Sequence, residues 1–163
     1  MSEITVGSKL PEAKLLVVGA NGPEAVELGE KLRGRKVVIF GLPGAYTGTC
    51  STAHVPSFIR TAGKFAEKGV DEIICIAVND PFVMKAWGEA TGATAAGITF
   101  LSDADGGFAK AVGLSFDAPP AGLFGRSKRY ALLAEDGVVK MLHLEASPGQ
   151  CEISGGETLL DAI

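Results

Sequence analysis

The segment KVVIFGLPGAYTGTC, residues 36–50, decides the fold of this chain. It opens with a β-branched apolar run that ends at Gly41 and Pro43, which predicts a buried central strand. After a glycine-rich turn, apolar residues recur at helical spacing and predict an amphipathic helix from about Cys50 to Lys68, bent at Pro56. A strand that turns directly into a helix indicates an α/β fold.

Short apolar runs on both sides of this segment predict further strands. A helix is expected to follow Asp80 and Pro81, which supply an N-cap and a proline at the first helical position, and to end before Gly88. Shorter helices are expected at 108–112 and 157–163. The other strands are predicted at residues 14–18, 73–78, 99–101, 130–134 and 138–144.

The dipeptide Asp136-Gly137 lies between the last two predicted strands and indicates a tight β-hairpin. Strands that alternate with helices and then end in a hairpin predict a single α/β domain over residues 1–163. Its central mixed β-sheet is expected to carry helices on both faces and to end in a C-terminal β-hairpin. Residues 113–125, which contain Pro119 and Pro120, are expected to form one long irregular loop.

Composition and charge narrow the class of partner. The chain has 15 basic and 19 acidic residues, a formal net charge of −4 and no dense cluster of lysine and arginine, so a nucleic-acid partner is not expected. No apolar run reaches the roughly 18 residues of a membrane span, and residues 1–5 do not resemble a leader, which predicts a soluble cytoplasmic protein without a membrane partner. The three cysteines are far apart and odd in number, so we expect thiols rather than a disulfide framework.

Cys50 occupies a position where a cysteine becomes reactive. With Thr47 as N-cap it is the third residue of the predicted helix, so the free N–H groups and the positive end of the helix dipole favour its thiolate. The thiolate is the nucleophilic form of cysteine. The turn between the strand and the helix therefore predicts a catalytic thiol.

Pro43, Thr47 and Cys50 follow the spacing proline, three residues, threonine, two residues, cysteine, which resembles the active-site signature of the peroxiredoxin family. Residues 41–56 and 78–87 are most similar to its branch called type II or peroxiredoxin five, and the resemblance extends over essentially the whole chain. It implies a thioredoxin-like fold with an extended N-terminus. It also implies a thiol peroxidase that reduces hydrogen peroxide and alkyl hydroperoxides with no cofactor: no metal, haem or flavin.

The same resemblance implies roles for individual residues. Cys50 matches the peroxidatic cysteine, which attacks a peroxide oxygen and becomes a sulfenic acid. Thr47 matches the hydroxyl that hydrogen-bonds the thiolate and positions the peroxide, and Pro43 matches the residue that shields the site from water. Arg129 occupies the place of the active-site arginine, which stabilises the thiolate and the departing oxygen, with Arg126 as the alternative.

Recycling of the sulfenic acid has two routes, an external thiol and a second cysteine. The resemblance implies thioredoxin, glutaredoxin or glutathione as the reductant, and a homodimer. Direct resolution by glutathione or glutaredoxin is narrowly favoured, with Cys151, in a polar segment expected to be exposed, as the alternative resolving thiol. Cys75 lies in a predicted buried strand and is expected to be structural, although plant-type relatives place a second cysteine there. Gly48 replaces the usual proline of the family and leaves the first helical turn more mobile.

Neighbouring residues allow other interpretations of the motif. His54 follows Cys50 by four residues and shares its helix face, which is compatible with a Cys/His pair or half of a metal site. The chain has two histidines and no CxxC pair, so no metal is expected, and we expect His54 to hydrogen-bond near the turn without transferring a proton. A thioredoxin-type reductase is disfavoured because Ala53 stands where a second cysteine is needed. A redox-sensing adaptor that relays oxidation to a partner thiol is the alternative function.

Overall fold

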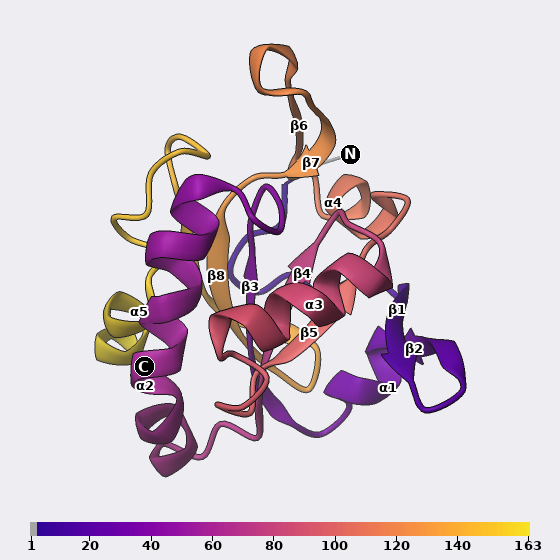
Figure 1. Ribbon diagram of the computed structural model, residues 1–163. Helices are drawn as coiled ribbons and strands as arrows, with labels where there is room; N and C mark the ends of the chain where they lie inside the picture. The colour runs from indigo at the N-terminus through magenta and orange to yellow at the C-terminus, as the bar shows by residue number, and fades with distance from the viewer. Residues whose placement is uncertain (1–2) are drawn as a thin grey trace.

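The computed structural model describes residues 3–163, which are built around a seven-stranded mixed sheet with the order β2-β1-β5-β4-β3-β8-β9 (Figure 1). β3, β4 and β5 run parallel to one another, and the pairs outside them are antiparallel. The predicted central strand is confirmed, because β3 lies between β4 and β8. The strands are β1 (Lys14–Gly19), β2 (Gly22–Glu27), β3 (Lys36–Gly41), β4 (Glu72–Ala77), β5 (Thr99–Ser102), β8 (Tyr130–Glu135) and β9 (Val138–Leu144).

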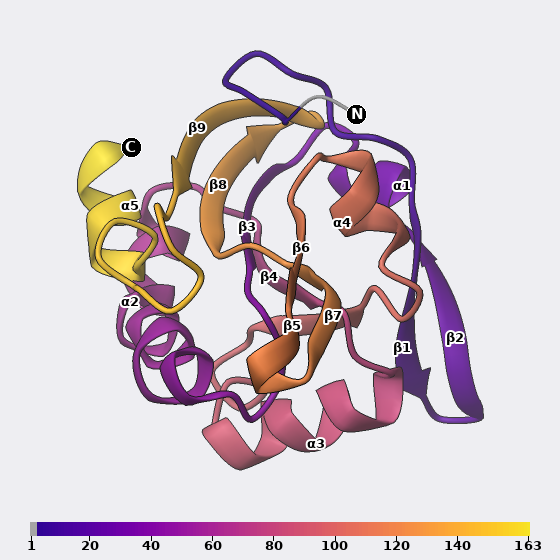
Figure 2. The same ribbon diagram turned by 90° about the horizontal axis from the view of Figure 1, so that it is seen from above.

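Helices cover both faces of the sheet, as predicted (Figure 2). One face carries α2 (Val55–Glu67), α3 (Pro81–Thr91) and α5 (Gly156–Ala162), and the other carries α1 (Leu28–Leu32) and α4 (Gly107–Ala111). Val38 and Phe40 of β3 pack on the α2 side, while Val37 and Ile39 pack on the opposite side. This double burial explains why residues 37–40 of the strand are all apolar. Within residues 3–163, no helix is long and apolar enough to cross a lipid bilayer.

The local signals at α3 and at the C-terminal hairpin are confirmed with one difference. The Asp80 carboxylate accepts a hydrogen bond from the N–H of Val83 at 2.9 Å, so it caps α3. Gly88 lies inside this helix and does not end it. It is buried at a position where a side chain would meet Phe100, and the left-handed C-cap is Gly92 instead. The turn between β8 and β9 has positive φ angles of 51° and 77° at its two residues, which fits a type I′ hairpin.

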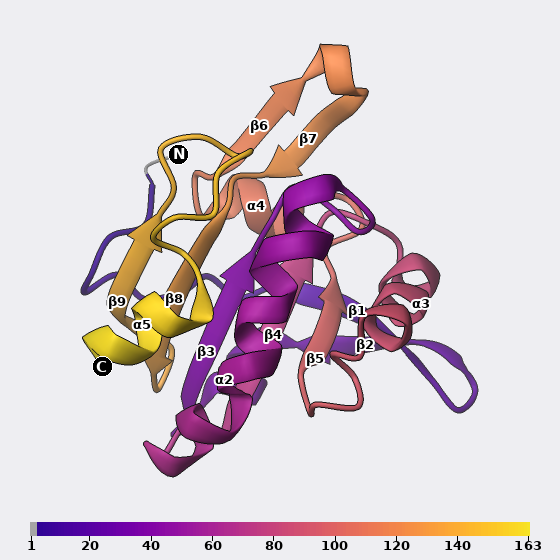
Figure 3. The same ribbon diagram turned by 60° about the vertical axis from the view of Figure 1, so that its left-hand side comes forward.

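Two strand pairs depart from the prediction. β2 was not expected, because an edge strand that pairs only with β1 tolerates the charged and turn-forming residues of its sequence, GPEAVE. Residues 113–125 are not an irregular loop: β6 (Ser115–Ala118) and β7 (Leu123–Ser127) form a separate antiparallel ribbon. The two prolines lie in a 3-10 turn at its tip, where they remove no hydrogen bond from the ladder. The ribbon projects from the body of the domain (Figure 3).

Candidate active site

Cys50 lies at the end of the turn that follows β3, and it is completely buried. The helix begins at Gly48, so Cys50 is its third residue, as expected. The next turn is π-helical, η1 (Cys50–His54), and the N–H of Val55 donates to the carbonyl of Cys50. Single π-helical turns of this kind occur frequently at functional sites.

The structure gives the two candidate arginines different contacts. Arg129 immediately precedes β8, which pairs with β3, and its Nη2 donates to the sulfur of Cys50 at 3.0 Å. It is buried, with 2% of the residue exposed. Arg126 instead donates to the carbonyl of Pro43 at 3.0 Å. The fold therefore brings Arg129 to the thiol, and Arg126 braces the turn.

The guanidinium of Arg129 has a partner for each nitrogen. Nε donates to the carbonyl of Pro148 at 2.9 Å, Nη1 lies 3.0 Å from Nδ1 of His54, and Nη2 contacts Cys50. Among the residues that the structure describes, no carboxylate forms an ion pair with Arg129. A buried cation that lacks a carboxylate partner favours negative charge at its remaining contact, and that contact is the sulfur of Cys50.

His54 is a neutral hydrogen-bond acceptor in this site. Burial, together with the charge of Arg129, lowers its pKa to about 3. Its Nε2 lies 3.0 Å from the carbonyl oxygen of Ser154. Because a guanidinium only donates and a carbonyl only accepts, Nδ1 accepts from Arg129 and Nε2 carries the proton. The expected hydrogen-bonding role of His54 is confirmed, and the lone pair that a Cys/His pair would use is already occupied.

Thr47 differs from the expectation in its hydrogen bond. Its hydroxyl donates to the carbonyl of Gly44 at 2.8 Å, rather than capping the helix or reaching the sulfur of Cys50. The turn is tight here, because Tyr46 adopts a left-handed conformation with φ 63° and the Asn79 side chain accepts a backbone N–H of the turn at 2.8 Å. Since the hydroxyl proton of Thr47 is donated to the turn itself, its oxygen is left as an acceptor.

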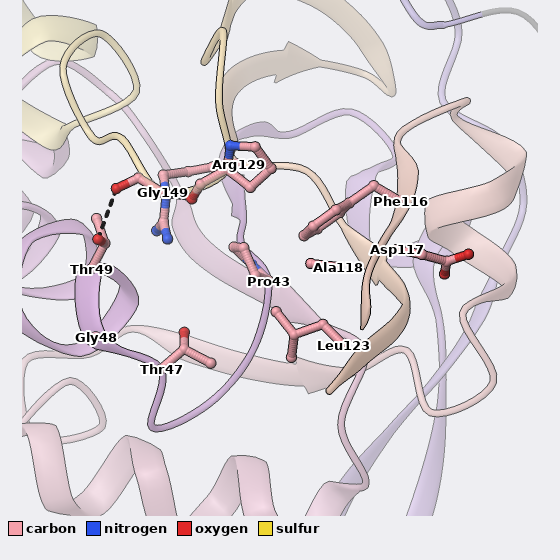
Figure 4. A pocket seen from close by; sticks show the side chains of 11 residues that line it. Pro43, Thr47, Gly48, Thr49, Phe116, Asp117, Ala118, Leu123, Arg129 and Gly149 are labelled. Carbon is pink, nitrogen blue, oxygen red and sulfur yellow. Dashed lines mark hydrogen bonds between the residues drawn. The ribbon is translucent and has the colours of Figure 1, made fainter. Parts of the chain in front are cut away.

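A pocket of about 430 Å³ opens beside the turn. Figure 4 shows Phe116 and Leu123, both from the β6–β7 ribbon, on the side of the pocket that faces Pro43, with Arg129 at one end. Cys50 is buried and does not line the pocket, so the pocket is bordered by residues next to Cys50 and not by Cys50 itself. The apolar wall that Phe116 and Leu123 form was not predicted. Its one signal in the sequence is the presence of large apolar residues in a segment rich in turn formers.

A loop over residues 145–155, here called the C-terminal strap, lies against the active-site turn. Three of its carbonyls accept hydrogen bonds from that turn and its arginine. The carbonyl of Pro148 accepts from the guanidinium and that of Ser154 from the histidine ring described above. The carbonyl of Gly149 accepts from the Thr49 hydroxyl at 2.9 Å, the dashed line in Figure 4. Apart from Cys151, the strap was not predicted as part of the site, since a backbone carbonyl leaves no signature in sequence.

Glu145 holds the strap closed. Its Oε2 accepts hydrogen bonds from the N–H groups of Glu152, Ile153 and Ser154 and from the Ser154 hydroxyl, at 2.6–3.0 Å. Burial alone would raise the pKa of Glu145, but these hydrogen bonds outweigh it and lower the pKa below its ordinary value. A charged acceptor with this many donors fixes the conformation of the loop.

The other two cysteines are less suited to reaction than Cys50. Cys75 is completely buried in β4, and that burial raises its pKa well above the ordinary value, as expected of a structural thiol. Cys151 was expected to be exposed, but it is half-buried within the strap, and burial raises its pKa too. The Ser154 hydroxyl lies 3.9 Å from its sulfur. All three cysteines are free thiols.

Comparison with known sequences assigns the family. Residues 5–160 match the family model described as Redoxin. The chain is similar to peroxiredoxin-2E-2, chloroplastic, of Oryza sativa subsp. japonica, at 46% identity over all of this chain and 74% of that protein. It is also similar to peroxiredoxin-2C of the same species, at 43% identity over the full length of both.

Solved structures agree. Reduced Prx3 from Vibrio vulnificus, in complex with hydrogen peroxide, superposes with a TM-score of 0.90 at 46% identity over 98% of both chains. Oxidised Prx3 from the same organism gives a TM-score of 0.89 at 45% identity over 98% of this chain and 99% of that one. With a thioredoxin-like fold and a buried thiol beside an arginine, the chain belongs to the peroxiredoxin family, in its type II branch, and is a thiol-dependent peroxidase.

Proposed function

We propose that Cys50 is the cysteine with which this peroxidase attacks its substrate. The observation that carries the proposal is the 3.0 Å contact between its sulfur and Nη2 of Arg129, a buried cation held by neutral partners on its other two nitrogens. Burial raises the pKa of both Cys75 and Cys151, which disfavours the thiolate of each. Cys50 is the thiol to which the fold supplies a cationic hydrogen-bond donor.

The reaction follows from this arrangement. The thiolate of Cys50 attacks the terminal oxygen of the peroxide, so that an S–O bond forms while the O–O bond breaks. The bonding electron pair leaves with the second oxygen, which takes up a proton from water and becomes water or an alcohol. The cysteine is oxidised to a sulfenic acid. Arg129 stabilises the negative charge as it moves from sulfur to the departing oxygen.

The neighbours of Cys50 orient the peroxide. In this proposal the Thr47 oxygen, whose own proton goes to the Gly44 carbonyl, accepts a hydrogen bond from the O–H of the attacked oxygen. Pro43 shields the sulfur from bulk water. The apolar wall formed by Phe116 and Leu123 leaves room for an organic group, which supports alkyl hydroperoxides as substrates besides hydrogen peroxide.

An external thiol completes the cycle in this proposal. The sulfenic acid condenses with the thiol, forming a disulfide and releasing water, and a second thiol then reduces that disulfide and restores Cys50. Glutathione or a glutaredoxin thiol is the favoured reductant, with thioredoxin, or Cys151 acting internally, as the alternative. Because Cys50 is completely buried, a bulky thiol reaches it only if the first helical turn opens. Gly48, which has open space around it, makes such opening easier.

The test of this proposal is chemical identification of the reacting thiol. Protein treated with one equivalent of hydrogen peroxide and the sulfenic-acid trap dimedone should carry the adduct on Cys50, as read by mass spectrometry of peptides. Cys50→Ser should lose peroxide consumption, because a hydroxyl hardly ionises near neutrality, while the matched controls Cys75→Ser and Cys151→Ser should keep the first oxidation step. More than a few per cent of residual peroxidase activity in Cys50→Ser, or an adduct elsewhere, contradicts the proposal.

We also propose that the chain acts as a cytoplasmic homodimer. Tyr46 and Phe82 support the dimer, because each is a large aromatic residue with 59% of its surface exposed, and Tyr46 lies near Trp87 of the helix that carries Phe82. Sedimentation equilibrium should give twice the chain mass, and Phe82→Glu should lower it. The three free thiols support a reducing compartment, which fractionation of the native cells tests.

A further inference from the structure

The C-terminal strap, residues 145–155, is the part of the site that the reaction described above does not use. Its backbone carbonyls accept hydrogen bonds from the active-site turn and from the arginine beside it. We propose that Glu145 is a positioning residue, whose carboxylate holds the strap against the active-site turn and so keeps that turn closed around Cys50. The proposal rests on the role proposed for Cys50.

One oxygen of Glu145 organises the strap. Its Oε2 accepts from three consecutive backbone N–H groups, those of residues 152–154, and from the Ser154 hydroxyl, at 2.6–3.0 Å. The N–H of Glu145 donates to the carbonyl of Arg129 at 3.0 Å, which fixes the start of the strap. Glu145 is buried, and within residues 3–163 no cationic side chain forms an ion pair with it. The charge of the carboxylate therefore acts within the strap, where it strengthens every one of these hydrogen bonds.

The closed strap binds both the arginine and the helical turn that flank Cys50. The carbonyl of Pro148 accepts from Nε of Arg129 at 2.9 Å, and that of Gly149 accepts from the Thr49 hydroxyl at 2.9 Å. Thr49 precedes Cys50 in the first helical turn. Its hydrogen bond therefore ties a turn that has to open during the cycle to a loop that the Glu145 carboxylate holds in place.

The two half-reactions place opposite demands on this turn. Attack on the peroxide uses the closed turn, in which Nη2 of Arg129 meets the sulfur of Cys50 at 3.0 Å. Reduction of the sulfenic acid by an external thiol uses an open turn, because Cys50 is completely buried when the turn is closed. A residue that favours the closed turn speeds oxidation and slows reduction, so its removal should do the reverse. A general loss of stability would not move the two rates in opposite directions.

Three substitutions and a control test this role. Glu145→Ala removes the acceptor and leaves three N–H groups and a hydroxyl without it. Glu145→Gln keeps an acceptor oxygen but removes the charge, which about halves the strength of each hydrogen bond. Thr49→Val keeps the shape of the side chain and breaks only the tie to Gly149. Glu152→Gln is the matched control, because it neutralises an exposed carboxylate of the same strap and keeps the backbone N–H.

Both half-reactions are measured in a Cys151→Ser background, in which the strap carries no competing thiol. Oxidation by hydrogen peroxide is followed in competition with horseradish peroxidase, and reduction by glutathione as the decay of the sulfenic acid that dimedone still labels. Glu145→Ala should be oxidised about tenfold more slowly and reduced about threefold faster, with smaller shifts of the same signs in Glu145→Gln. Thr49→Val should be reduced about threefold faster and oxidised within about twofold of the parent, and Glu152→Gln should leave both rates within about twofold.

Slower oxidation together with faster reduction in Glu145→Ala, and not in the control, supports the inference. Any other pattern of the two rates would overturn it in favour of a purely structural role. If circular dichroism shows that Glu145→Ala does not fold, the same criterion applies to Glu145→Gln. Hydrogen exchange gives a readout that does not involve Cys50: the amides of residues 152–154 should exchange faster in both Glu145 variants, and unchanged exchange contradicts the inference. Peroxidase activity retained by Cys50→Ser would count against the proposed function alone, so the two failures are distinguishable.

Discussion

Replacing Arg129 by lysine keeps the charge at the site and changes the shape of the cation. The guanidinium meets the sulfur of Cys50 through Nη2 at 3.0 Å, while its other nitrogens bind Pro148 and His54. A lysine ammonium would lie near the position of the guanidinium carbon, about 1.3 Å, one C–N bond, short of Nη2. The distance from nitrogen to sulfur would therefore rise to roughly 4 Å, and one ammonium could not keep all three partners.

The expected loss follows from these distances. At an effective dielectric constant of about 20, moving a cation from about 3 to about 4.3 Å from a thiolate weakens their attraction by ~1.7 kcal/mol. Loss of the directional hydrogen bond to a charged acceptor adds roughly 1 kcal/mol. The total of about 2.7 kcal/mol corresponds to ~100-fold slower oxidation, the loss typical of removing one preorganised donor.

Stopped-flow fluorescence measures this rate directly. The chain has one tryptophan, Trp87, and its Nε1–H donates at 3.0 Å to the hydroxyl of Ser51, the neighbour of Cys50, so the emission should respond when the thiol is oxidised. Arg126→Lys is the matched control, because it alters a cation that braces the Pro43 carbonyl, and it should slow oxidation by no more than about threefold. A large loss in Arg126→Lys with a nearly silent Arg129→Lys would refute the reasoning.

Three further outcomes follow from the structure. Gly48→Pro should stabilise the first helical turn by about 0.4–1 kcal/mol, because open space surrounds this residue and its φ is not positive. A turn that opens less easily should slow reduction of the oxidised enzyme by glutathione about two- to fivefold, and faster reduction contradicts this. Phe116→Ala should lower kcat/KM for cumene hydroperoxide about fivefold more than for hydrogen peroxide, and an unchanged ratio of the two shows that the ribbon does not bind the organic group. Glu145 has a lowered pKa, so the stability that its carboxylate contributes is fully present above its ordinary value of 4.5 and lost as pH falls through the lowered pKa. Thermal melts from pH 7 to pH 3 should therefore show a steeper fall of Tm in the wild type than in Glu145→Gln, and parallel curves contradict this assignment.

The parts of the fold that sequence predicts well are those encoded within a few residues. Asp80 caps a helix through a hydrogen bond to a residue three positions away. Residues 136–137 adopt the positive φ angles that their types favour. The spacing of Pro43, Thr47 and Cys50 identifies the turn that we propose to be reactive, because all three residues lie within positions 43–50. Such signals need no knowledge of the partner strands.

The parts that sequence did not reveal depend on distant pairing. The β6–β7 ribbon contains two adjacent prolines and several glycines, which indicate a loop unless the strands on either side are known to pair. The direction of the Thr47 hydroxyl was also mistaken, because the left-handed turn at Tyr46 brings the carbonyl of Gly44 within its reach. The same limit applies to Cys151, whose polar neighbours suggested exposure, although the strap that contains it packs against the active-site turn.

The hydrogen-bond partners of Arg129 explain how its guanidinium is oriented without an acidic side chain. Nε and Nη1 are held by a carbonyl and a neutral imidazole, which orient the guanidinium without neutralising it. A carboxylate at either position would form an ion pair with the guanidinium and reduce its attraction for the thiolate. The nearby strap does carry a buried carboxylate, Glu145, but its charge is satisfied by N–H and O–H groups of the strap itself. The positive charge of Arg129 is therefore left for Cys50 and, in the proposed reaction, for the oxygen that departs from the peroxide.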